Sequence, residues 1–333
     1  MLDVVKGNEK RVTSRGSLPN LPVTPACRQA WRYPLLVTFV LWATIAVASG
    51  EKSSGADFLR IDPGAHAASM GGSFSALAED VQALYYNPAG LALVGHTQFT
   101  ASHMEWLAGM QSEYAAMAFP AGSMGWGVSM SYLHSEETER DALGRAGATF
   151  GVGDGALTGG LGVRLTEHHH VGMSVKFLQR HLYHRSANGF AADLGYQYRI
   201  QDGTGAFWKF AFTLKNAGPG IGFAIKEKMP TELEGSAAWQ PMVWYRRPLT
   251  LTVALNQGSA QDGIGGRIGI EGTILSRFHL RAGYFGSRQR SEKLRVGFGV
   301  DLFDLGRIDF AAIRIDRFNS SLLMSLTLQT AGK

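Results

Sequence analysis

FAADLGYQYRI, residues 190–200, alternates between mostly large apolar side chains and small or polar ones. Successive side chains of a β-strand point to opposite faces, so this stretch is predicted to be a strand with one apolar face and one polar or bare face. The same period of two recurs along the chain from about residue 98. Further examples are GWGVSMSYL (125–133), IGGRIGIEG (264–272), FHLRAGYF (278–285) and SSLLMSLTLQ (320–329). Most of the chain is therefore predicted to be all-β.

Two architectures produce such alternation: a soluble sandwich with the apolar face inside, and a membrane barrel with the apolar face toward lipid. The non-apolar face is rich in glycine, and strands of about ten residues suit a tilted strand that crosses a bilayer. Aromatic residues near strand ends suggest interfacial girdles: Trp126, Trp208, Trp239, Trp244 and Tyr245. These features favour a closed antiparallel transmembrane β-barrel of about 14 strands between residues 97 and 329, with an even strand number favoured by closure.

The first 48 residues have the order of a secretory signal peptide. A basic stretch precedes the apolar run PLLVTFVLWATIAV (34–47), and Ala46-Val47-Ala48 fits a cleavage site. The run is shorter than the roughly 20 residues of a helical span, although an uncleaved anchor remains the alternative. Export and a barrel together predict the outer membrane of a Gram-negative type of cell, with membrane lipid as one partner.

Charge and cysteine content exclude several classes of function. The chain has 32 Lys and Arg against 27 Asp and Glu, but residues 1–48 hold six of the former and two of the latter. The remaining 26 and 25 leave the mature chain nearly neutral, which argues against a nucleic-acid partner. The single cysteine, Cys27, lies in the leader, so the mature chain has no disulfide and no thiol nucleophile.

Residues 55–92 lack the two-residue alternation. The stretch 73–86 reads as a short amphipathic helix that ends at Asn87-Pro88. A short apolar arm outside a barrel would be exposed, whereas inside the barrel it would be a plug. The predicted organisation is a signal peptide (1–48), a short N-terminal helical hatch inside the lumen (49–96) and a transmembrane barrel (97–333).

The sequence from Phe58 to Ala92 resembles the N-terminal signature of the PorV/PorQ family of outer-membrane proteins, within the wider FadL-like barrel group. The matching pieces are Phe58-Leu59 with Ile61, the run AASMGG (67–72), Ala76 with Asp80, and NPAGL (87–91). The resemblance implies a 14-stranded barrel with a hatch in its lumen. The hatch motif that it implies comprises Met70, Gly71, Gly72, Asp80, Asn87, Pro88, Ala89 and Gly90.

The resemblance leaves the function open among three readings. PorV-like members serve type IX secretion, which implies an accessory of protein secretion or surface assembly with a secretion translocon or secreted proteins as partners. FadL takes up long-chain fatty acids and other hydrophobic compounds, which implies a transporter of hydrophobic small molecules with a pocket on the hatch. The possible pocket residues are Phe58, Leu59, Ile61, Phe74, Leu77 and Leu84. The third reading is a structural barrel without specific cargo. The secretion reading is the main expectation, because the signature is nearer to PorV/PorQ.

Catalysis, metal binding and cofactors are not expected. The chain has no GxxxxGK[ST], HExxH or GxSxG motif, and its glycines are expected to relieve crowding in the lumen. Five of the ten histidines lie in HHHVGMSVKFLQRHLYH (168–184), but they fall at opposite ends of one predicted strand and should not converge on a metal. Glu79 and Asp80 are expected to bond to hatch backbone or to a lumen arginine such as Arg164 or Arg199.

Overall fold

The structure is a computed structural model that describes residues 54–241, 249–259, 263–286, 292–315 and 320–330. The expected signal peptide and Cys27 lie outside these residues.

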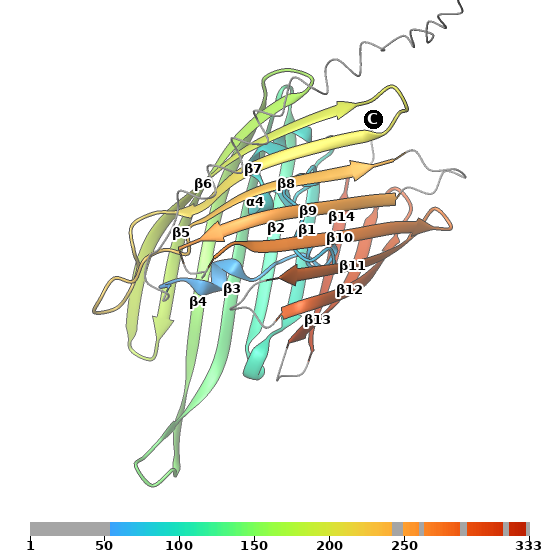
Figure 1. Cartoon of the computed structure of the whole chain (residues 1–333). Helices are drawn as coiled ribbons and strands as arrows, with labels where there is room; N and C mark the ends of the chain where they lie inside the picture. Colours follow the sequence, from blue (N-terminus) through green and yellow to red (C-terminus); the bar gives the residue numbers. More distant parts are fainter. Residues whose placement is uncertain (1–53, 242–248, 260–262, 287–291, 316–319, 331–333) are drawn as a thin grey trace, which may run out of the picture.

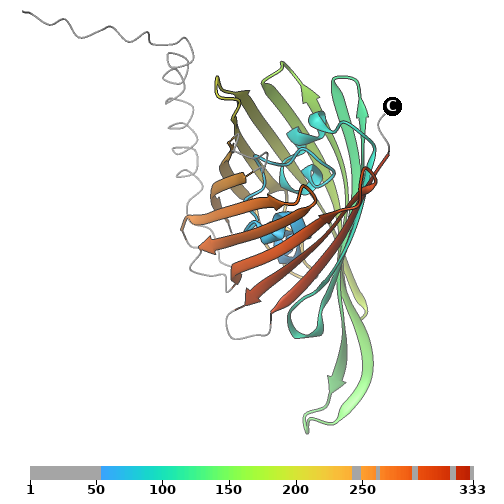
Figure 2. The ribbon, with the colours of Figure 1, turned by 90° about the vertical axis from the view of Figure 1, so that its right-hand side faces the viewer.

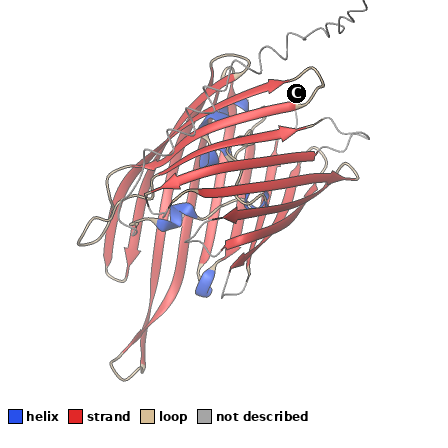
Figure 3. Ribbon diagram, viewed as in Figure 1, coloured by secondary structure: helices blue, strands red, loops and turns tan. Residues whose placement is uncertain are grey.

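Fourteen antiparallel strands close into one barrel, as the alternation predicts (Figures 1 and 3). Each strand pairs with its neighbours in sequence, and β1 pairs with β14 to complete the cylinder. The strands are β1 (Gln98–Glu105), β2 (Gln111–Ala121), β3 (Met124–Arg140), β4 (Ala146–Arg164), β5 (His169–Leu182), β6 (Arg185–Gln201), β7 (Phe207–Ala217), β8 (Glu232–Gln240), β9 (Leu249–Gly258), β10 (Gly265–Ile274), β11 (Phe278–Gly286), β12 (Glu292–Asp301), β13 (Gly306–Ile315) and β14 (Ser321–Gln329).

The barrel has two unlike ends. The near end holds the first residue of β1 beside the last residue of β14, because Gln98 pairs with Gln329. The β2–β3 turn at this end is tight and consists of residues 122–123. At the far end β3 and β4 extend well past the other strands, and their hairpin projects beyond the rim (Figure 1).

Side-chain exposure decides between a sandwich and a membrane barrel. Large apolar side chains such as Leu157 (58% exposed) and Ile268 (55% exposed) lie on the outer surface, whereas charged residues such as Glu234 and Asp309 are completely buried inside. A soluble sandwich would bury the apolar face, so this arrangement is that of a transmembrane barrel. Because adjacent strands are hydrogen-bonded around the ring, the backbone needs no water at the lipid face.

Three of the expected girdle residues, Trp126, Trp208 and Trp239, lie at the near end of the barrel. Trp208 and Trp239 stack with ring centroids 5.7 Å apart. The other two, Trp244 and Tyr245, lie outside the described residues. Trp126, Trp208 and Trp239 therefore form an aromatic group at one interface.

Residues 54–97 form the hatch and run through the lumen before β1 begins (Figure 2). Their short helices are η1 (Asp57–Arg60), α3 (Ala65–Ser69), α4 (Ala83–Tyr86) and η2 (Pro88–Leu93), and a further turn, η3 (Leu107–Gly109), joins β1 to β2. Among the described residues, no helix combines the length and the apolar character needed to span a membrane.

The predicted helix over 73–86 is wrong except for its last turn, α4. The reason is that side chains, together with isolated turns, satisfy backbone carbonyls of this stretch that a helix would pair with its own amides. Asn87 donates to the Ser75 carbonyl (3.0 Å), and Gln197 of β6 donates to the Ala76 carbonyl (2.8 Å). The apolar face that suggested a helix still packs, since Phe74, Val81 and Leu84 belong to one buried cluster.

Candidate functional site

Asn87 and Pro88 fix the hatch against one side of the barrel. Pro88 opens η2, where a missing backbone N–H costs nothing, and Asn87 caps this helix by accepting from the Ala89 N–H at 3.1 Å. The Asn87 amide also donates to the Ser75 carbonyl and, at 3.2 Å, to the Tyr196 carbonyl of β6. The side chain is completely buried, so it joins two parts of the hatch to the barrel in one hydrogen-bonded unit.

The barrel face that receives η2 lacks side chains. Gly125, Gly162, Gly172 and Gly195 are successive cross-strand partners on β3, β4, β5 and β6. A Cβ added at Gly162 would lie 2.5 Å from the Ala92 nitrogen and 2.8 Å from the Pro88 oxygen. One layer farther from the near end, Gly127 pairs with Gly160. We call these six glycines the bare wall.

The bare wall confirms that lumen glycines relieve crowding. Hatch backbone lies where side chains would otherwise stand, which is the close approach that glycine permits. A row of glycines in register across four strands also explains part of the chain's high glycine content, 42 of 333 residues.

Met70, Gly71 and Gly72 form a turn on the opposite side of the lumen. Gly71 and Gly72 adopt φ of 72° and 73°, in the left-handed region that favours glycine. The turn packs on a second glycine pair, Gly269 of β10 and Gly283 of β11, which are cross-strand partners. The two glycine-containing hatch motifs therefore dock on two glycine patches of the barrel.

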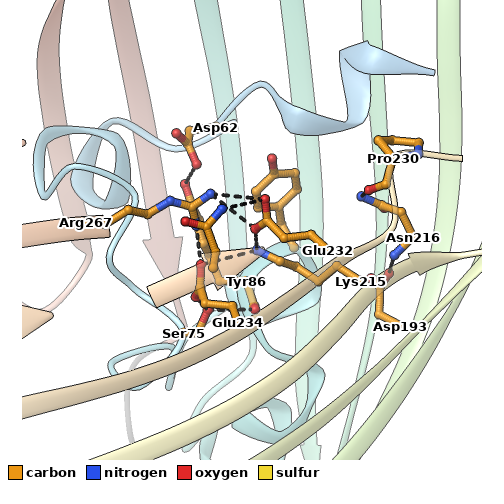
Figure 4. Close-up of polar contacts among 12 residues, drawn as sticks. Asp62, Ser75, Tyr86, Asp193, Lys215, Asn216, Pro230, Glu232, Glu234 and Arg267 are labelled. Carbon is orange, nitrogen blue, oxygen red and sulfur yellow. Dashed lines mark hydrogen bonds and ion pairs between the residues drawn. The ribbon is translucent and has the colours of Figure 1, made fainter. Parts of the chain in front are cut away.

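The lumen side of β7 to β13 carries charged side chains, which we call the charged wall, and Figure 4 shows those of β7, β8 and β10. Arg267 of β10 contacts Glu234 and lies 3.2 Å from Glu232, both on β8, and Lys215 of β7 lies 3.3 Å from Glu232. All four side chains are buried. Ser75 of the hatch donates to Glu234, so this group of charges also holds the hatch. Buried charges need such pairing, because an isolated one is costly in a low dielectric.

Further charged contacts join the hatch to β12. Asp62 accepts from the Tyr86 hydroxyl at 2.9 Å, and its other oxygen contacts Arg295. Arg295 is almost completely buried and also lies 3.4 Å from the Ala68 carbonyl. Asp62 thus ties two distant parts of the hatch to each other and to the barrel.

A third charged group lies toward the near end. His66 of α3 lies 3.0 Å from a Glu271 oxygen, and its Nδ1 accepts from Arg307 at 2.6 Å. Arg281 contacts Glu271 and donates to Asp309 at 2.7 Å. Because an arginine only donates, the His66 Nδ1 carries no proton in this arrangement.

Glu79 and Asp80 bind the two kinds of partner that were expected, a basic lumen side chain and hatch backbone. Glu79 lies 2.8 Å from Lys209 and 3.5 Å from Arg199, so the lumen arginine is Arg199 and not Arg164. Asp80 accepts from the Gln82 backbone N–H at 2.9 Å, which starts the turn into α4.

A small cavity lies in the far half of the barrel, between the hatch and β2–β5. Its volume of about 20 Å³ holds one or two water molecules and is too small for an organic ligand. Hatch residues line one side, and Tyr114, Ser129, Tyr132 and Thr158 belong to the other. We call it the far cavity.

The six predicted pocket residues divide between the far cavity and the packed interior. Phe58, Leu59, Ile61 and Leu84 line the far cavity. Phe74 belongs to the buried cluster around α4, and Leu77 packs beside it and against Ala211 and Ala238. The sequence predicted all six as pocket residues because they lie in the hatch. The structure shows which four of them line a cavity and which two are packed.

The histidines of 168–184 lie at opposite ends of β5, as expected. His168 and His169 are at the near-end turn, and His181 and His184 are at the far end. Within the described residues, no group of three or more potential metal-ligating side chains converges.

Sequence reasoning missed the charged wall. The available signal was the placement of charged residues at inward-facing positions of strands with a two-residue alternation. These residues are Glu232, Glu234, Arg267, Arg281 and Arg295. Their partners were not readable, because they come from the hatch or from other strands, up to two places away around the barrel.

Comparison with known proteins supports the same architecture. A family model described as "Uncharacterised protein family (UPF0164)" matches residues 43–180, which include the hatch, β1 to β4 and most of β5, but not β6. No curated protein matches the chain.

Several solved structures share the fold. The TodX deltaS2S3 mutant monoaromatic hydrocarbon channel aligns with a TM-score of 0.55 at 15% identity, over 80% of this chain and 98% of that one. The CymD monoaromatic hydrocarbon channel aligns at 0.53 and 12%, over 81% and 97%. The Pseudomonas putida toluene transporter TodX aligns at 0.52 and 15%, over 83% and 99%. At such identities the similarity establishes the fold, a 14-stranded barrel of the outer-membrane kind.

Proposed function

We propose that the protein is an outer-membrane channel for small hydrophobic molecules, held closed by its hatch. The observation that carries the proposal is the far cavity, where Phe58, Leu59, Ile61 and Leu84 of the hatch present an apolar surface toward the far mouth. The shared fold with hydrocarbon channels supports the same class of cargo by analogy.

The described conformation is a closed one. Two small cavities, of about 10 and 20 Å³, lie beside the hatch and share Leu59, Tyr85 and Lys176. Neither admits a molecule of the size of toluene. Passage through these cavities therefore requires part of the hatch to move.

The test is uptake of radiolabelled toluene by Gram-negative cells with an intact outer membrane, with and without this protein. We expect faster uptake in cells that produce it. Vancomycin sensitivity of the same cells controls for general leakage and should not change, since the lumen is plugged. Equal toluene uptake with and without the protein would refute the proposal, and so would uptake that rises only together with vancomycin sensitivity.

A variant makes the test specific to the cavity. Ile61→Gln places an amide on the apolar side of the far cavity and should slow toluene uptake, because an unpaired amide there costs free energy to any apolar occupant. Leu143→Gln is the matched control, since Leu143 is 78% exposed at the tip of the β3–β4 hairpin and far from the lumen.

An accessory role in protein secretion or surface assembly is the second candidate. One feature favours it: the projecting hairpin of β3 and β4, which offers a partner protein a two-stranded surface beyond the barrel rim. The N-terminal signature supports it less, because Asn87, Gly71 and Gly72 have roles within this chain. Purification through a C-terminal tag, with a chain shortened at 137–148 as control, tests it. Secreted proteins or a large barrel should co-purify only with the full hairpin.

A further inference from the structure

The two sides of the lumen hold the hatch by different forces. The charged wall binds it through ionic contacts, such as Asp62 with Arg295 and Glu79 with Lys209 at 2.8 Å. The bare wall has no lumen-facing side chains, so it meets the hatch mainly through van der Waals contact. Beside it on β6, two hydrogen bonds join the hatch: Asn87 donates to the Tyr196 carbonyl, and Gln197 donates to the Ala76 carbonyl. Separation from the bare wall leaves no buried charge unpaired, whereas separation from the charged wall does.

The bare wall adjoins the far cavity on its near-end side. Register places three inward-facing layers on β3 to β5, from the far end toward the near end. The first contains Ser129, Thr158 and Lys176; the second Gly127, Gly160 and Ser174; the third Gly125, Gly162 and Gly172. Members of the first layer line the far cavity. The cavity therefore opens onto the glycine layers wherever the hatch does not fill them.

Two leucine side chains fill that space. A Cβ added at Gly127 would meet Leu84 Cδ1 at 2.6 Å, and one added at Gly160 would meet Leu84 Cδ2 at 2.8 Å and Leu91 Cδ1 at 3.2 Å. Leu84 also lines the far cavity, so its side chain separates this cavity from the glycines of the second layer. Both leucines are almost completely buried.

We propose that hydrophobic molecules pass along the bare wall between β3 and β5, and that Leu84 and Leu91 are the side chains that close this passage. The proposal rests on the proposed function and specifies its route. The charged wall acts as the fixed anchor, and the leucine-bearing part of the hatch is the part that withdraws.

The chemistry of the bare wall sets the class of molecule. Its glycines present only Cα hydrogens and backbone amides that the sheet already pairs, so it offers a ligand no free donor or acceptor. The charges beside it, Lys176 and Asp193, pair with each other at 2.8 Å, and Lys176 also donates to Asn216 at 2.6 Å. The passage therefore suits uncharged molecules without strong hydrogen-bonding groups, of about the width of the leucine side chains they replace.

The first test locates a ligand directly. Crystals of the Leu84→Ala variant soaked in iodobenzene should show an anomalous iodine peak beside Gly127 and Gly160, because the shortened side chain joins that space to the far cavity. Leu77→Ala is the matched control: the same change in the same hatch, packed against Ala211 and Ala238 instead. No peak in Leu84→Ala at the glycines would overturn the proposal.

The second test asks whether the same space conducts. Leu84→Ala should raise toluene uptake about ten-fold, because a buried Leu→Ala change removes the contacts that hold the passage shut. Adding Gly160→Val should reverse the gain by refilling the space from the barrel side, or Gly160→Ala should do so in part if the valine variant does not fold. Gly159→Val, whose side chain meets open space on the same strand, should leave the gain intact.

The two proposals fail separately. If the wild-type protein gives no toluene uptake above cells that lack it, the proposed function fails. If the wild-type protein conducts but Leu84→Ala and Leu77→Ala raise uptake equally, or Gly160→Val does not reverse the gain, the route along the bare wall is wrong.

Discussion

Gly162→Ala tests whether contact with the bare wall holds the hatch in place. The added Cβ would lie 2.5 Å from the Ala92 nitrogen, where ordinary contact begins at 3.4 Å, so η2 has to retreat by about 0.9 Å. The same retreat stretches the 3.2 Å hydrogen bond from Asn87 to the Tyr196 carbonyl beyond bonding distance. Overpacking costs about 1–3 kcal/mol and the loss of one hydrogen bond about 0.5–1.5 kcal/mol.

A combined cost of about 3 kcal/mol corresponds to a rise of about 100-fold or more in the population with the hatch displaced. The barrel itself should remain folded, because its ladder hydrogen bonds do not involve the new methyl group. Hydrogen exchange followed by mass spectrometry on the protein in nanodiscs measures the effect. Amides of residues 83–93 should exchange about 100-fold faster, and amides of β10 to β14 should be unchanged.

Gly159→Ala is the matched control, because it lies on the same strand and its Cβ meets nothing within 4 Å. It should leave the exchange of residues 83–93 as in the wild type. The reasoning is refuted if Gly162→Ala folds into the barrel and its hatch amides exchange at the rate of this control.

Three further predictions follow from the hatch and one turn. Arg267→Met leaves Glu232 and Glu234 without a main partner, so we expect a loss of about 3–5 kcal/mol and protease cleavage in the hatch, measured by limited proteolysis. Asn87→Ala removes the cap of η2 and two donated bonds, and faster exchange at residues 83–93 should reveal it. Hydrogen bonds from Thr204 lower the pKa of Asp202 in the folded protein, so the β6–β7 turn should be stable above pH 3.8, the ordinary pKa, and should weaken as the pH falls through the lower pKa of the folded state. The fluorescence of Trp208, which donates to Asp202, reports this change, and Asp202→Asn should abolish it.

The barrel was readable from the sequence because its signal is local. In the stretch 190–200 each residue's face follows from its parity alone, and the structure exposes Phe190 and Leu194 while it buries Asp193 and Gln197. The strand number and the closure were confirmed for the same reason: each strand pairs with its neighbour in sequence, so the topology requires no long-range choice.

The hatch was only partly readable. A segment distinct from the strands followed from a stretch without alternation, but the helix over 73–86 was predicted from an apolar periodicity that the barrel overrides. Gln197 and Asn87 supply the hydrogen bonds that a helix would otherwise make within itself. Local propensity loses when another element satisfies the backbone.

The sequence by itself determined the barrel, its inward and outward faces, and the hatch that precedes it. Only the tertiary structure decided that Gly125, Gly162, Gly172 and Gly195 align into one bare wall and that the charges gather on the lumen side of β7 to β13. Alternation is a property of a single strand, whereas these groupings depend on the register between strands and on where a hatch of some forty residues lies inside them. Register and packing are set by the closed assembly, and no single stretch of chain contains them.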